Sequence, residues 1–141
     1  MPTYTIATAV AIELDIRKSR FIGLILPVDH RDAAMQELDR IRAQHRAATH
    51  VCWALMAGGQ SGMSDDGEPS GTAGRPMLEV LRHHELEGVL AAVVRYYGGI
   101  KLGSGGLVRA YTDAVASALK QATRIERIAE LLRAGEGVRT N

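Results

Sequence analysis

Aromatic residues are scarce in this chain. They make up 4% of its 141 residues, and Trp53 and Phe21 are the sole tryptophan and phenylalanine. Proteins that bind single-stranded nucleic acid without sequence preference stack successive bases on aromatic side chains. The composition therefore predicts that rows of stacking rings do not dominate any nucleic-acid contact of this chain.

Cysteine, net charge and long apolar runs are equally scarce. Cys52 is the lone cysteine, so no internal disulfide can form, which fits a reducing cytoplasm. The net charge of +1 gives no global attraction to nucleic acid or membrane, so a charged partner would need a local patch. No run approaches the ~18 apolar residues of a membrane helix, and no basic segment precedes residues 5–12 as in a signal peptide. We expect a soluble cytoplasmic domain without membrane contact.

The chain does contain 46% apolar residues, spaced with the periods of strands and helices. The predicted strands are 4–14, 20–28, 49–59 and 88–99, and the predicted helices are 32–45, 76–86, 105–122 and 124–134. Asp32 and Ser104 are the expected N-caps of two helices. The strand at 88–99 is the most apolar, which places it centrally. This order predicts an α+β two-layer sandwich, in which a mixed sheet carries helices on one face.

Two glycine-rich stretches stand where a predicted strand leads into a helix: "SDDGEPSGTAGRP" at 64–76 and "RYYGGIKLGSGGLVR" at 95–109. The first N–H groups of a helix lack internal partners and favour negative charge, and glycines let a backbone approach a ligand. Three carboxylates and one arginine give the first stretch a charge of −2, and three cations give the second +3. We therefore expect that the two stretches form one bipolar groove, that is, a groove with negative charge on one side and positive charge on the other. Its predicted anion-binding residues are Arg75, Arg95, Lys101, Ser104, Gly105, Gly106 and Arg109, and its acidic residues are Asp65, Asp66 and Glu68.

Other interpretations of these stretches stay open from the residues alone. The glycines would equally serve tight turns and close packing, with the charges neutralising one another at the surface. A dinucleotide fingerprint would need glycine at 108, which is valine, and a Walker A loop would need Ser or Thr after Lys101, where leucine stands. We expect no catalytic constellation and no cofactor. Magnesium bridging Asp65, Asp66 and Glu68 is the alternative.

The two stretches, together with "KSRFIG" at 18–23, closely resemble the signature of the IMPACT/YigZ family. The resemblance covers about residues 4–122 and implies the second-domain fold of ribosomal protein S5. It also implies a link to translation: eukaryotic members bind the scaffold that activates a starvation-responsive initiation-factor kinase, and bacterial members are proposed to bind nucleic acid or ribosomes. We expect an IMPACT N-terminal-like domain at 1–123. A C-terminal helix and tail at 124–141 would then stand in place of the ferredoxin-like domain that bacterial members usually carry.

Three functions are compatible with these observations, and a non-catalytic module that binds RNA or the ribosome through the groove is preferred. The acidic residues oppose this function unless they face elsewhere or magnesium bridges them. A bipolar surface also suits a protein partner, so the second function is a protein-interaction module that regulates a stress-response kinase pathway. The third is a small-molecule phosphate-binding enzyme. The S5-type fold also underlies small-metabolite kinases whose phosphate loop is similar to "LGSGGL", and Asp65 or Asp66 would then hold magnesium or act as base.

Overall fold

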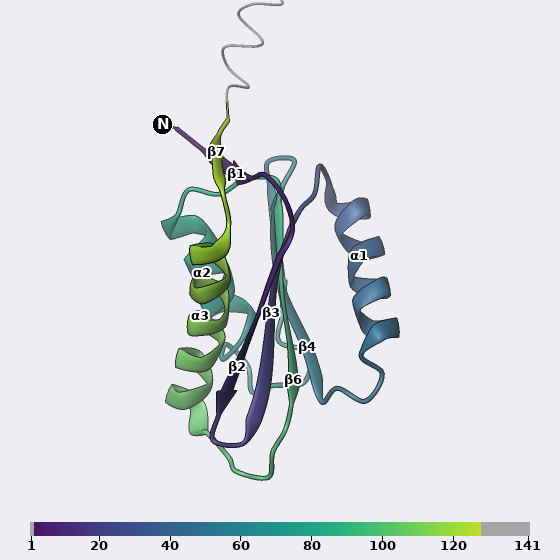
Figure 1. Cartoon of the computed structure of the whole chain (residues 1–141), viewed down its shortest axis with the longest axis vertical. Helices are drawn as coiled ribbons and strands as arrows, with labels where there is room; N and C mark the ends of the chain where they lie inside the picture. Colours follow the sequence, from purple (N-terminus) through teal and green to yellow (C-terminus); the bar gives the residue numbers. More distant parts are fainter. Residues whose placement is uncertain (1, 128–141) are drawn as a thin grey trace, which may run out of the picture.

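A computed structural model describes residues 2–127 of the chain, which form three layers around one β-sheet (Figure 1). The sheet contains, in spatial order, β2 (Val10–Ile16), β3 (Ser19–Pro27), β6 (Val89–Tyr96), β4 (His50–Ala57) and β5 (Gln60–Ser64). The helices are α1 (Arg31–Gln44), α2 (Gly74–His83) and α3 (Gly103–Gln121). A separate two-stranded ribbon pairs β1 (Tyr4–Ile6) with β7 (Arg124–Glu126). None of the helices described is long and apolar enough to cross a membrane.

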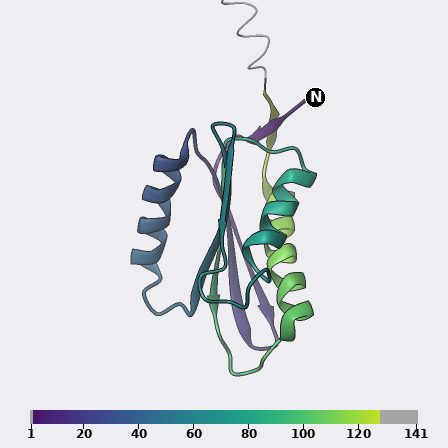
Figure 2. The ribbon, with the colours of Figure 1, turned by 180° about the vertical axis from the view of Figure 1, so that it is seen from behind.

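The helices cover both faces of the sheet. α2 and α3 pack on one face and α1 lies on the other, as the opposite views of Figures 1 and 2 show. The α+β class is confirmed, but the prediction that all helices lie on one face was wrong. The physical reason is β6, which is buried at every position from Val89 to Arg95. Such a strand needs cover on both faces.

The central place of β6 was predicted correctly from its apolar run. It pairs with β3 on one side and β4 on the other, and both pairings are antiparallel. The remaining pairs of the larger sheet, β2 with β3 and β4 with β5, are antiparallel hairpins. The sheet is therefore antiparallel among its named strands, and the prediction of a mixed sheet was wrong.

Several element boundaries also differ from those predicted. The strand at 4–14 is split at residues 7–9, because its first part pairs with β7 and its second with β3. Residues 60–64, which lie outside every predicted strand, form the edge strand β5, whose sequence QSGMS has no apolar alternation to reveal it. Residues 124–126 are a strand and do not begin a helix. The rest of the predicted helix at 124–134 lies outside the described residues.

The helix caps differ from those predicted, with a consequence for the site. His30 caps α1 in place of Asp32, and its Nδ1 accepts the N–H of Ala33 at 3.2 Å. α3 begins at Gly103, so Ser104 lies inside its first turn, and its N-cap residue Leu102 makes no side-chain cap. The first N–H groups of α3 therefore lack a capping side chain from that position.

Candidate functional site at the start of α3

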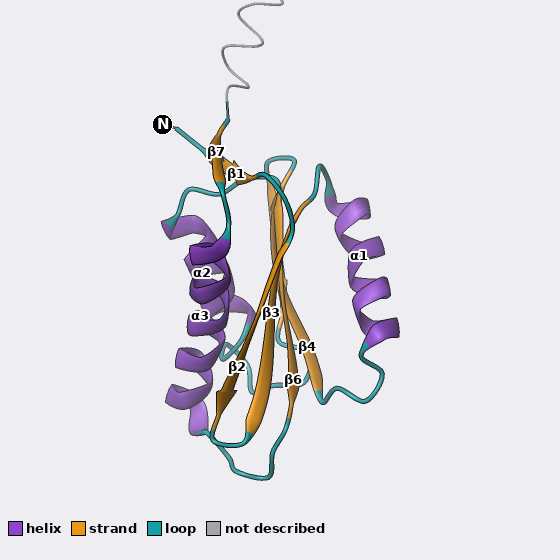
Figure 3. Cartoon of the chain, in the orientation of Figure 1, coloured by secondary structure: helices purple, strands orange, loops and turns teal. Residues whose placement is uncertain are grey.

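Three segments meet at one end of the molecule, the lower end in Figure 3. They are the β2–β3 turn, the β6–α3 loop (residues 97–102) and the first turn of α3. The packing there is close: a Cβ at Gly98 would lie 1.9 Å from the carbonyl oxygen of Lys18. Gly99 and Gly103 have φ angles of 89° and 74°, which favour glycine. The fold therefore explains these three glycines without a ligand.

The acidic loop (residues 65–73) connects β5 to α2, and its first carboxylate serves the loop itself. Asp65 accepts backbone N–H groups from Gly71 at 2.9 Å, Ala73 at 3.1 Å and Gly74 at 2.8 Å. Burial of this carboxylate works to raise its pKa, but the three N–H donors outweigh burial and lower the pKa of Asp65 below its ordinary value. Asp65 thus supplies the cap at the start of α2 that Ala73 cannot.

The second carboxylate of the acidic loop attaches the loop to β4. Asp66 Oδ2 accepts the N–H of Val51 at 2.7 Å, and its carbonyl oxygen accepts Nδ1–H of His50 at 2.7 Å. Cys52 Sγ, buried on the same strand, donates to the carbonyl oxygen of Asp65 at 3.0 Å. Burial raises the pKa of the Cys52 thiol to about 12, so this thiol stays protonated at neutral pH.

The third carboxylate, Glu68, forms a buried ion pair with Arg95 of β6. Only 3% of the Glu68 side chain and 5% of the Arg95 side chain are exposed, and Arg95 Nη1 donates to both carboxylate oxygens at 3.0 and 2.8 Å. The hydroxyl of Tyr111 also donates to Glu68, and His50 Nε2 lies 3.4 Å from its Oε1. Ser19 Oγ accepts Arg95 Nη2 at 3.2 Å. Arg95, predicted to meet phosphate, is therefore engaged inside the protein.

The carboxylates of the three acidic residues do not point toward one common partner. That of Asp65 accepts from the start of α2, that of Asp66 accepts from β4, and that of Glu68 pairs with Arg95 of β6. Within residues 2–127 no group of three His, Cys, Asp or Glu side chains is placed to hold a metal ion. The acidic loop is thus held by its own carboxylates, which face backbone N–H groups and a guanidinium.

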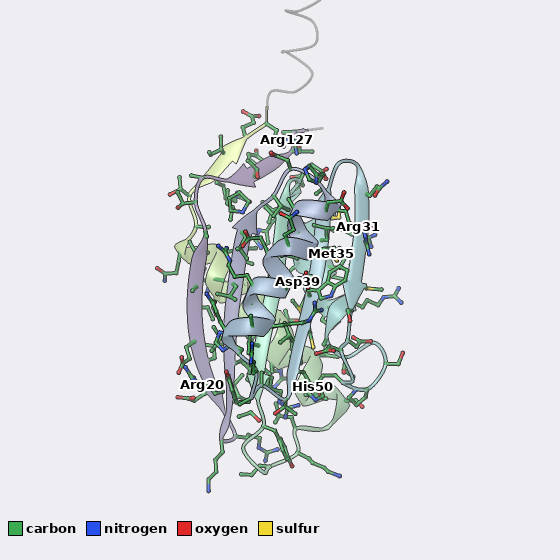
Figure 4. The ribbon with its side chains drawn as sticks, turned by 90° about the vertical axis from the view of Figure 1, so that its right-hand side faces the viewer. Arg20, Arg31, Met35, Asp39, His50 and Arg127 are labelled. Atoms are coloured by element: carbon green, nitrogen blue, oxygen red, sulfur yellow. The ribbon has the colours of Figure 1, made fainter. Side chains whose placement is uncertain are left out.

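A cavity of about 410 Å³, here called the α3 pocket, opens beside the start of α3. The Glu68–Arg95 pair lies in its wall, and His50 lies at the same lower end of the sheet as Arg20, opposite Arg127 (Figure 4). The other polar groups of the pocket belong to Thr49, His50, Lys101 and Ser104, and its apolar wall is made by Pro69, Tyr97, Leu102 and Leu107. The pocket brings together three of the predicted anion-binding side chains, Arg95, Lys101 and Ser104, of which Arg95 is already paired with Glu68.

The remaining predicted cations lie elsewhere. Arg75 lines a separate cavity of about 510 Å³ between α2 and α3. Arg109 and Gly106 line another, of about 370 Å³, together with Arg17 and Asp113. The predicted residues thus border three cavities, and the single bipolar groove was an oversimplification of their arrangement.

Gly105 is a glycine whose identity the fold leaves unexplained. A Cβ built on it meets no heavy atom within 4 Å, and its φ is not positive, whereas a Cβ on Gly106 would come 3.1 Å from Leu102 Cβ. Glycine inside a helix costs roughly 1 kcal/mol relative to alanine. The open space above Gly105 lies at the uncapped start of α3, where a ligand could approach the backbone.

Sequence reasoning missed several residues of this end. Thr49, His50 and Tyr97 line the α3 pocket, but single polar or aromatic residues at the ends of strands carry no signal of a site. Arg17 and Lys18 form the two-residue β2–β3 turn with φ of 47° and 67°, which is the geometry that usually takes Asn-Gly. Two cations in such a turn are a signal that could have been used.

Fold and site together define a class: a small α+β domain with a ligand-sized pocket beside an uncapped helix start. The Impact N-terminal domain family matches residues 17–119. The chain belongs to the IMPACT family, as the resemblance of its two glycine-rich stretches predicted.

Curated relatives and a solved structure agree with this assignment. An IMPACT family member of Haemophilus influenzae is 49% identical over 118 residues, which cover 80% of this chain and 57% of that protein. YigZ of Escherichia coli is 48% identical (83% and 60% covered), and YvyE of Bacillus subtilis is 45% identical (88% and 58%). The crystal structure of a hypothetical protein matches with a TM-score of 0.86 at 44% identity, covering 89% of this chain and 64% of that one. The chain therefore spans less than two thirds of each of these relatives.

Proposed function

We propose that the chain is a non-catalytic module that acts in translation or its regulation by binding RNA phosphates around the start of α3. The observation that carries this proposal is a group of exposed cations at that end. Among residues 2–127 none of them forms an ion pair within 4.0 Å. They are Arg17, Lys18, Lys101 and Arg109.

These cations border the helix start from two sides. Lys101 lines the α3 pocket, and Arg17 and Arg109 line the neighbouring cavity; Leu102, the N-cap residue, contributes to both. Asp113 is the carboxylate in the second cavity, so two arginines against one carboxylate leave a charge of +1 there. The helix dipole and the first N–H groups of α3 add to this attraction for phosphate.

The carboxylates of the acidic loop are all engaged within the protein, which weakens their repulsion of phosphate. Asp65 and Asp66 accept backbone N–H groups, and Glu68 is neutralised by Arg95. The repulsion that three free carboxylates would exert is therefore reduced, and no bridging cation is required. The link to translation is supported by the family resemblance, and RNA of the ribosome is the ligand that it suggests.

The proposal is tested by fluorescence anisotropy with a short single-stranded RNA at 50 and 200 mM salt, with and without Mg²⁺. Each phosphate neutralised on a single strand contributes a slope of about −0.7, so four cations predict that affinity falls about 50-fold over this range. The affinity should not depend on Mg²⁺ beyond the general salt effect.

Charge reversal just before the start of α3 and in its last turn supplies the matched control. Lys101→Glu should lower the affinity at 50 mM salt about tenfold and flatten the salt slope by about 0.7. Lys120→Glu changes the net charge equally, but it lies about 28 Å further along α3 and should leave affinity within twofold. Equal losses in both variants, or no binding by the wild type, would overturn the proposal and favour a protein partner.

A further inference from the structure

We propose that the α3 pocket binds one unpaired nucleotide, with its base in the pocket and its phosphate at the start of α3. This inference rests on the proposed function and specifies the form of nucleic acid that the module takes. Three features of the pocket carry it: its apolar wall, its polar edge and its continuity with the phosphate site.

The apolar wall suits a flat aromatic ring. Tyr97 is 44% exposed although it lines the pocket, and the guanidinium carbon of Arg95 lies 5.3 Å from its ring centroid. The buried Arg95–Glu68 pair therefore supports a tyrosine ring whose surface is still partly free. Pro69 and Leu102 complete the wall. A cavity of about 410 Å³ falls within the ~300–1,000 Å³ typical of small-ligand pockets.

The polar edge can bond a base or ribose. Thr49 Oγ1 accepts the N–H of Tyr97 at 2.9 Å, which leaves the hydroxyl proton of Thr49 to donate. Ser104 adds a second hydroxyl on the helix side. His50 is fixed by its Nδ1–H bond to the Asp66 carbonyl, so its ring position does not depend on a ligand.

The base and phosphate positions are continuous. Lys101, Gly103 and Ser104 line the same cavity as Tyr97, and the open space above Gly105 lies in the next position of α3. A nucleotide with its base against Tyr97 can thus direct its phosphate to Lys101 and the helix N–H groups.

This arrangement selects unpaired bases. A base inside a duplex is stacked on both faces and paired along its edge, so it cannot enter a pocket unless it leaves the helix. The same chemistry is offered by a free mononucleotide and by an unpaired residue of RNA. The experiment therefore includes both ligands.

The test compares a short oligouridylate with an abasic oligomer that carries the same number of phosphates. Wild-type protein should bind the base-bearing oligomer about tenfold more tightly, since stacking on one aromatic ring is worth about fivefold or more. Tyr97→Leu should abolish this preference without changing the salt slope. Tyr97→Phe keeps the ring and should retain the preference. Lys101→Glu should weaken both oligomers alike.

The outcomes separate this inference from the proposed function. Equal affinity of wild-type protein for the two oligomers overturns the nucleotide pocket while RNA binding stands, and binding of neither overturns both. Uridine monophosphate bound as tightly as the oligomer supports the pocket and identifies a free nucleotide as its ligand. If Tyr97→Leu unfolds, an oligomer carrying 4-thiouridine should photocrosslink to Tyr97 in wild-type protein. Crosslinks confined to the β1–β7 ribbon, at the opposite end of the molecule (Figure 3), would overturn the inference.

Discussion

Replacing Gly105 by alanine is expected to stabilise the protein and to weaken its binding of RNA. The added methyl group meets no heavy atom within 4 Å, and the helical φ of this position suits alanine. Glycine-to-alanine changes at compatible sites stabilise by about 0.4–1 kcal/mol, mainly because the unfolded chain loses freedom. For a chain of this length, 1 kcal/mol corresponds to about 2–4 °C in Tm.

Two nearby glycines, Gly106 and Gly98, provide the controls, since the structure predicts a different change in stability for each. Gly106→Ala would bring its Cβ 3.1 Å from Leu102 Cβ and should gain less or nothing. Gly98→Ala would place a Cβ 1.9 Å from the Lys18 carbonyl oxygen, so one of the two segments must move and Tm should fall.

The two readouts for Gly105→Ala are differential scanning calorimetry and RNA anisotropy. A lower Tm would refute the reasoning that the fold does not need this glycine. A higher Tm with unchanged RNA affinity would show that the open space above α3 does not admit a phosphate. A higher Tm with at least a severalfold weaker affinity is the expected result, and it would mean that stability is given up at this position for binding.

Three further predictions concern the acidic loop and its neighbours. Glu68→Ala leaves the Arg95 guanidinium buried without its counter-charge and should destabilise by about 3–5 kcal/mol in urea unfolding, whereas a loss below 1 kcal/mol would contradict the buried pair. The lowered pKa of Asp65 contributes stability that is present above its ordinary value of 3.8 and is lost as pH falls below it; Asp65→Asn should lack that acid dependence in pH-resolved melts. Cys52 ionises near 9.0 when unfolded but only near 12 when folded, so the free energy of unfolding should fall between these pH values, and Cys52→Ala should show a smaller fall.

The sequence predicted the parts of the fold that depend on local pattern. The apolar run of residues 88–99 identified the central strand, and the strand patterns at 4–14 and 20–28 overlap β2 and β3. The strand β5 was not predicted, because Gln60–Ser64 owes its strand conformation to pairing with β4. The strand β7 was not predicted either, because it pairs with a strand at the other end of the chain. In both cases pairing with another strand, which is near in the sequence for β5 and at the opposite end of the chain for β7, overrides local propensity.

The candidate site shows the same division. Lys101 and Ser104 could be located from the sequence, since both lie within a few residues of a recognisable helix start; both line the α3 pocket, and their binding of an anion stays a prediction. Arg95 was misassigned because a cation in a sequence looks the same whether it faces solvent or a buried carboxylate. Its partner Glu68 lies 27 residues away, and only the three-dimensional arrangement brings the two together. The engagement of Asp65 and Asp66 by backbone N–H groups is likewise a tertiary property.

The β1–β7 ribbon joins the two ends of the described chain, which limits where the polypeptide can be shortened without loss of a strand. Tyr4 pairs with Glu126, and the N–H of Arg127 donates to the carbonyl oxygen of Thr3 at 2.7 Å. A fragment ending at residue 123 would lose β7 and leave β1 without this neighbour. Because the two strands are antiparallel and their outer ends lie together, tension applied at residues 2 and 127 would unzip their hydrogen bonds one at a time. The ribbon would open before the five-stranded sheet carried any of that load.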